Sequence, residues 1–113
     1  MGVNMEDLLE EKRSEKRTHF EPSDTGHILE ATLSGKKYYF KVLDKGLGGM
    51  GMLVKDSQTE VLKELRVGHQ LPMKYSNPKG SLLVNIEIRH ITAIMTGSFK
   101  GHYKFGLSMS ISG

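Results

Sequence analysis

The chain has 113 residues, a net charge of +3 at pH 7 and no cysteine. The lack of cysteine excludes disulfides, thiolate nucleophiles and thiolate metal sites, and it fits a cytoplasmic protein. No apolar run approaches the roughly 20 residues that cross a bilayer, and the N-terminus lacks the apolar core of a secretory signal, so we expect no membrane association.

The charge is unevenly distributed along the chain. Residues 1–26 carry four basic and seven acidic side chains, whereas residues 27–113 carry twelve basic and six acidic ones. A basic body favours an anionic partner, such as a nucleotide, a nucleic acid or an acidic protein surface. The alternative is that these lysines only keep the surface soluble.

The N-terminal part is expected to be an arm that precedes the folded body. Residues 4–16 have helical spacing of apolar side chains, and Asn4 can cap such a helix. Residues 17–26 contain proline, serine, aspartate and glycine, which are typical of a linker or turn. We therefore divide the chain into an arm over residues 1–26 and a domain over residues 27–113.

The remainder of the chain has β-strand character. Short runs rich in β-branched and aromatic residues alternate with turn signals, among them Ser34-Gly35 between the first two runs. The segment 57–70 fits either a single helical turn or a loop, and Pro72 suggests that the following strand lies at a sheet edge. This pattern predicts an all-β fold, a small six-stranded antiparallel barrel, with strands near residues 27–34, 36–44, 50–55, 70–76, 81–96 and 101–112.

A glycine-rich stretch, LDKGLGGMGMLV, separates two of the predicted strands. Residues 46–51 spell G-x-G-x-x-G, which in dinucleotide-binding folds must be followed at once by a helix. Here a β-prone run follows, so we do not expect that fold.

Neither a metal site nor a catalytic site is indicated. The five histidines show no H-x-H or H-x-x-x-H spacing, and no nucleophile elbow is present. We therefore expect no metal, no cofactor and no enzymatic activity.

Arg13 and Arg17 are spaced i, i+4, so on a helix they would share one face, with Lys12 and Lys16 beside them. Two guanidinium groups on one face can bind phosphates in a bidentate manner. The alternative is a solvated helix face on which the acidic neighbours neutralise both arginines, namely Glu10, Glu11 and Glu15.

Arg13-x-x-x-Arg17, followed after about 27 residues by DKGLGGMG over residues 44–51, resembles the motifs of the PilZ domain. That family comprises bacterial receptor modules for cyclic di-GMP, and its pattern is R-x-x-x-R before a six-stranded antiparallel barrel and [D/N]-x-S-x-x-G between the second and third strands. The stretches VGHQLPMKY and EIRHI…GHYKFGLSM are also similar to the family, so the resemblance spans roughly residues 11–110.

The resemblance implies a cyclic di-GMP site between the arm and the glycine loop. Arg13 and Arg17 would bind phosphates and guanine edges, and Asp44 would accept hydrogen bonds from a guanine. Gly49 would permit the tight backbone path, and Gly46 stands where the family has serine. Further candidates for ligand contact are Lys12, Lys45, which replaces a usually apolar residue, and Gly48. The family's C-terminal helix is missing from this sequence, which would favour a homodimer or a protein partner.

Three functions follow from these observations. The first is a non-enzymatic cyclic di-GMP receptor or adaptor whose arm becomes ordered on binding and changes the surface presented to a downstream protein partner. The second is a degenerate interaction module that has the barrel but binds no nucleotide. The third, less favoured, is a basic barrel that binds single-stranded nucleic acid through strand aromatics; alternation would instead turn Tyr38 and Phe40 to one face and Tyr39 to the other.

Overall fold

A computed structural model describes residues 17–111. The predicted helix over residues 4–16 lies outside the described residues. The described part contains seven strands and one short helix, in the order β1 (Thr18–His19), β2 (Ile28–Leu33), β3 (Lys36–Lys45), β4 (Gly49–Val54), α2 (Thr59–Glu64), β5 (Gln70–Asn77), β6 (Gly80–Ala93) and β7 (Tyr103–Ile111).

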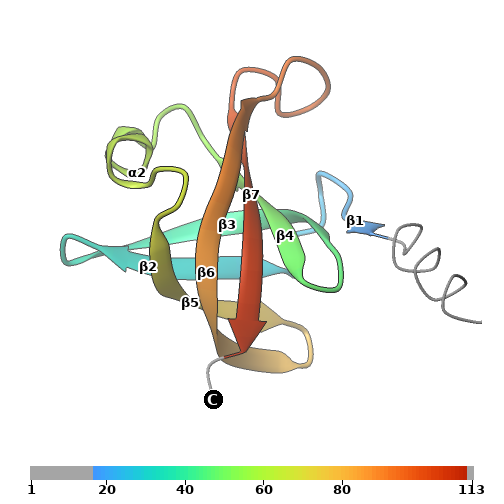
Figure 1. The fold of residues 1–113 in the computed structure, drawn as a ribbon. Helices are drawn as coiled ribbons and strands as arrows, with labels where there is room; N and C mark the ends of the chain where they lie inside the picture. The colour runs from blue at the N-terminus through green and yellow to red at the C-terminus, as the bar shows by residue number, and fades with distance from the viewer. Residues whose placement is uncertain (1–16, 112–113) are drawn as a thin grey trace, which may run out of the picture.

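Six of these strands form a closed antiparallel barrel, as predicted. The strand order is β1-β3-β2-β5-β6-β7-β4, and an additional pairing between β3 and β4 closes the ring (Figure 1). Closure pairs both sides of each of the six strands with a neighbour along part of its length, so no strand is left as a free edge. Strand β1 stands outside this ring and pairs only with the end of β3.

Alternating side chains fill the barrel. On β3, Phe40 and Val42 are buried whereas Tyr39 is 58% exposed. Inward-facing residues of β4 and β7 meet them, among them Met52, which lies opposite Phe105. This period-two pattern is the one that the sequence predicts for half-buried strands. Tyr38 packs against the same core, so the predicted alternation of the strand aromatics is confirmed.

The ambiguous segment between β4 and β5 forms a single short helix, α2, to one side of the barrel (Figure 1). Its Val61 is fully buried, and Leu65 just after it is buried as well, so both side chains join the core. The Tyr38 hydroxyl donates a hydrogen bond of 2.6 Å to Glu60 on the helix. Burial of two apolar residues and this side-chain contact explain why so short a helix is stable here.

Two expectations about individual segments are wrong. The predicted linker contains strand β1, because Thr18 and His19 pair with Lys45 and Asp44. Strand β5 is not an edge strand, because it pairs with β6 along its whole length and with β2 over residues 74–76. Pro72 lies beyond the segment that faces β2, so no β2 carbonyl requires the N–H that proline lacks.

The hairpin between β2 and β3 turns at the predicted dipeptide. Ser34 and Gly35 have φ angles of 52° and 81°, and two positive φ angles in succession match the twist of antiparallel strands. Within residues 17–111, no helix is long and apolar enough to cross a membrane.

Candidate functional site

The structure brings Arg17 and Asp44 together, although they are 27 residues apart in the sequence. The pairing of His19 with Asp44 places the start of the arm against the end of β3. Arg17 Nη2 then donates to Asp44 Oδ1 at 2.7 Å, and Arg17 Nε donates to the same oxygen at 3.2 Å. Two of the residues in the R-x-x-x-R and D-x-G-x-x-G motifs are thus in direct contact.

Lys104 on β7 is a second cation at this carboxylate. Its Nζ lies 2.6 Å from Asp44 Oδ2, so each carboxylate oxygen has a cationic partner. Asp44 is 2% exposed and is the only charged residue in the described part of the chain that is fully buried. Burial acts to raise the pKa of Asp44, but hydrogen bonds from Lys104 and Arg17 and the two positive charges outweigh it, so the pKa lies below its ordinary value. Asp44 is therefore ionised at neutral pH.

A β-bulge explains why Asp44 lies outside the barrel core. Val42 pairs with Met52, but Asp44 pairs with Gly51, so β3 has one extra residue between them. Without that residue, Asp44 would share the inward face of Val42, since side chains two apart in a strand point the same way. The bulge turns the carboxylate to the outer face, as bulges often do near functional sites.

Across that outer face, Asp44 continues into a row of residues on neighbouring strands. Asp44 pairs with Gly51, Gly51 with Gly106, and Gly106 with His90. A Cβ on Gly51 would lie 2.5 Å from Lys104 Cε, and one on Gly106 would lie 2.1 Å from the His90 ring. The two glycines therefore leave the room that the lysine stem and the imidazole occupy. The face formed by these five residues is called the outer face below.

The glycines of the β3–β4 loop have different reasons to be glycine. A Cβ on Gly46 would lie 2.7 Å from Arg17 Nη1, so the serine that the family has here would collide with the guanidinium as it is placed. A Cβ on Gly49 would lie 2.6 Å from the backbone oxygen of Leu107. Gly48 has nothing within 4 Å of an added Cβ. Gly49 is thus explained by strand packing and Gly46 by the approach of Arg17.

The loop is not a dinucleotide fingerprint of the Rossmann type. Strand β4 begins at Gly49, inside the glycine stretch, and no helix follows the loop directly. Among residues 17–111, no three histidine or acidic side chains are grouped so that they could hold a metal ion.

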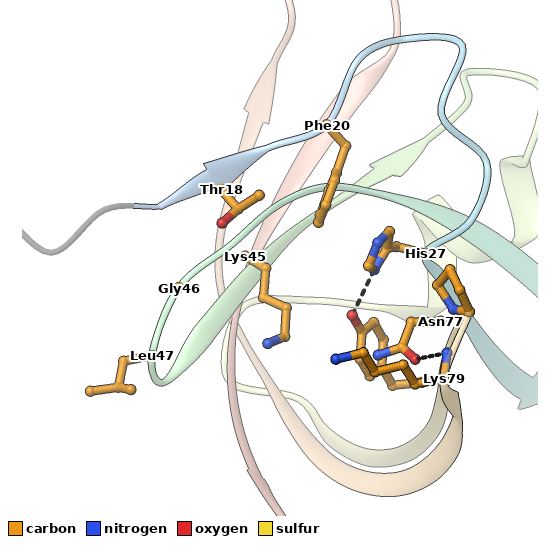
Figure 2. Close-up of a pocket in the computed structure, with 10 residues that line it drawn as sticks. Thr18, Phe20, His27, Lys45, Gly46, Leu47, Asn77 and Lys79 are labelled. Carbon is orange, nitrogen blue, oxygen red and sulfur yellow. Dashed lines mark hydrogen bonds between the residues drawn. The ribbon is translucent and has the colours of Figure 1, made fainter.

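Lys45 points away from the outer face, toward a cavity of about 600 Å³ at one end of the barrel (Figure 2). The arm, the β3–β4 loop and the β5–β6 turn surround this cavity, whose lining residues are Thr18, Phe20, His27, Lys45, Gly46, Leu47, Tyr75, Asn77, Pro78 and Lys79. Lys45 Nζ lies 5.8 Å from the centre of the Tyr75 ring. Asp44 and Lys45 thus serve opposite sides of the same strand end.

The remaining predicted site residues, Lys12 and Arg13, lie outside the described residues. Conversely, sequence reasoning missed Lys104, Gly51, Gly106 and His90. Their alignment depends on which strands are neighbours in the closed barrel and on a second register shift between Ile88 and His90. The stretch KFGLSM, with a glycine between two buried apolar residues, was the available signal for Gly106.

Comparisons with known proteins agree with this geometry at the level of the fold. No protein-family model and no curated protein matches the chain. Among solved structures, the complex of K. pneumonia MrkH with c-di-GMP superimposes with a TM-score of 0.72 and 16% identity over 87% of this chain and 44% of that chain. A structure of MrkH described as a c-di-GMP-dependent transcription regulatory factor gives 0.71 and 14% identity, over 86% of this chain and 43% of that chain.

The PilZ domain of YcgR from Escherichia coli, solved with c-di-GMP, gives a TM-score of 0.62 and 16% identity, over 83% of this chain and 74% of that chain. The chain therefore has the fold of a PilZ domain, which confirms the resemblance that the motifs indicate. It spans less than half the length of the MrkH chains. At identities this low the likeness establishes the fold alone.

Proposed function

We propose that this chain is a non-enzymatic, cytoplasmic receptor for cyclic di-GMP. The dinucleotide would bind on the outer face, between the arm that carries Arg13 and Arg17 and the end of β3 with its glycine loop. The contact between Arg17 and Asp44 carries this proposal, because it joins the two motifs at one point. Two solved structures of the same fold contain c-di-GMP, which supports the choice of ligand.

The charges at this point suit an anionic ligand with guanine edges. Arg17 and Lys104 bring two positive charges to one buried carboxylate, so the cluster of Arg17, Asp44 and Lys104 has a net charge of +1. Guanidinium groups bind phosphates well, and a carboxylate accepts the N–H groups of a guanine edge. Gly51 and Gly106 would let a flat ligand approach the strands closely.

Binding would require Arg17 to redistribute its hydrogen bonds. Asp44 Oδ1 is occupied by Arg17 and Oδ2 by Lys104, so a guanine edge must replace one of them. Release of Arg17 would free its guanidinium for a phosphate, while Lys104 would keep Asp44 ionised. The arm would then change its position relative to the barrel, and that change would be the signal to a downstream protein partner or a second copy of the chain.

The test is calorimetric titration of cyclic di-GMP into the full chain. We expect binding that falls by at least about tenfold in Arg13→Ala and in Arg17→Ala, since each loses charge-assisted contacts. Arg66→Ala, an exposed arginine after α2, is the matched control and should bind like the unmodified chain. Equal affinity in all four proteins would refute the site. Absence of binding at high ligand concentration would favour the degenerate interaction module.

A further inference from the structure

We infer that the cavity at the end of the barrel is a second binding site, separate from the outer face, for a small planar aromatic anion such as a purine mononucleotide. Its volume of about 600 Å³ lies within the range of small-molecule pockets. The inference does not depend on the proposed receptor function, because it rests on residues that do not touch Asp44.

The charge of the cavity selects an anion. Lys45 and Lys79 both extend into the space below Phe20 and His27 (Figure 2). No described residue that lines the cavity is acidic, and neither lysine takes part in an ion pair within residues 17–111. Two ammonium groups that face one apolar-lined space without a carboxylate favour a phosphate or carboxylate group between them.

The aromatic wall selects a flat ring. Phe20 and His27 are stacked, with ring centres 4.1 Å apart and planes 18° apart, and His27 Nδ1 is 2.8 Å from the hydroxyl of Tyr75. These contacts hold the rings in place before any ligand binds, so little side-chain entropy is lost on stacking. The Asn77 side chain adds an amide at the rim that can read a polar ring edge.

The two sites are separated by the alternation of β3. Asp44 faces the outer surface and its neighbour Lys45 faces the cavity, while Gly46 adjoins both. A ligand in the cavity would contact both the arm, through Phe20, and the β5–β6 turn, through Lys79. It would therefore hold the arm against the barrel without occupying the position of Arg17.

The test is a titration of the ¹⁵N-labelled full chain with GMP, with guanosine and inorganic phosphate as partial probes. We expect GMP to shift the amide signals of Tyr75, Asn77 and Lys79 and to leave those of Gly51 and Gly106 in place. Guanosine and phosphate alone should each bind at least about tenfold more weakly, because each makes only part of the contacts.

Lys79→Gln removes one ammonium group, and the backbone N–H that bonds to Asn77 is retained. This variant should bind GMP about tenfold more weakly. Lys100→Gln, an exposed lysine in the turn before β7, is the matched control and should not change affinity. Three results would overturn the inference: no response at millimolar GMP, shifts confined to Gly51 and Gly106, or equal affinity in the two variants. Failure here would leave the calorimetric test with Arg17→Ala unaffected.

Discussion

Replacing Asp44 by asparagine removes the charge on which the site is built and keeps the shape of the side chain. Asp44 is 2% exposed, and its oxygens accept bonds of 2.7 and 3.2 Å from Arg17 and 2.6 Å from Lys104. An asparagine amide can satisfy one of these cations with its oxygen, but its NH₂ group must then face the other. Two cations would be left around a neutral group, so Asp44→Asn should destabilise the fold.

The loss is limited by solvent at the two cations. A hydrogen bond to a charged group contributes about 1.5–3 kcal/mol when it is shielded, and an exposed ion pair contributes up to about 1 kcal/mol. The side chains of Arg17 and Lys104 are 44% and 37% exposed, so each pairing lies between these limits. We therefore expect Asp44→Asn to lower the free energy of unfolding by about 2–3 kcal/mol at pH 7, and the midpoint of thermal unfolding by about 10–20 °C.

The pH dependence is a second, independent signature. The pKa of Asp44 is lowered in the folded protein from its ordinary value of 3.8, because the bonds from Lys104 and Arg17 outweigh the effect of burial. A lowered pKa means that its stabilisation is fully present above pH 3.8 and is lost as pH falls through the folded-state pKa. The difference between the unmodified chain and Asp44→Asn should thus be constant from pH 5 to 8 and shrink below pH 4.

Urea denaturation followed by circular dichroism at pH 7, 5 and 3.5 measures both effects. Asp56→Asn, at a carboxylate whose side chain is 63% exposed, is the control and should change the free energy of unfolding by less than about 0.5 kcal/mol. The reasoning is refuted if Asp44→Asn lies within that same range of the unmodified chain at pH 7. It is also refuted if the difference grows as the solution is acidified.

Two further predictions concern the glycines. Gly49→Ala should lower the free energy of unfolding by about 1–3 kcal/mol, because its Cβ would meet a backbone oxygen that cannot move without disturbing β7, whereas Gly48→Ala should be neutral in the same urea assay. Gly106→Ala should cost about 1 kcal/mol by displacing the His90 ring, and the cost should disappear in a His90→Ala background. Equal costs in the two backgrounds would mean that the imidazole is not what the glycine accommodates.

The barrel itself was predictable from the sequence. Alternation of apolar residues gave the strands, and the Ser34-Gly35 turn fixed the first hairpin, because both signals are local. The short strand β1 carried no such signal. Its pairing depends on the position of Lys45 and Asp44 at the end of a strand ten residues long, and such long-range pairing leaves no mark in two residues of sequence.

The candidate site was predictable only in part. Spacing and resemblance pointed to Arg17 and Asp44, but nothing local indicated that Lys104 would reach the same carboxylate from the last strand. That contact depends on the bulge that turns Asp44 outward and on the pairing of β4 with β7. Register shifts arise from how whole strands fit together, so the side chains that they redirect are not predictable from periodicity.

The absence of a side chain at Gly46 gives this site a property that the family motif with serine lacks. Serine at this position would place its Cβ where Arg17 Nη1 now lies, so it would prevent the close approach of Arg17 to Asp44 seen here. Glycine permits that approach, and the pair is then formed without ligand. In the proposed receptor, cyclic di-GMP must compete with this internal ion pair, so the affinity would reflect the difference between two sets of hydrogen bonds. Loss of a hydroxyl contact and gain of an internal competitor act in the same direction, and both predict weaker binding than Gly46→Ser would show.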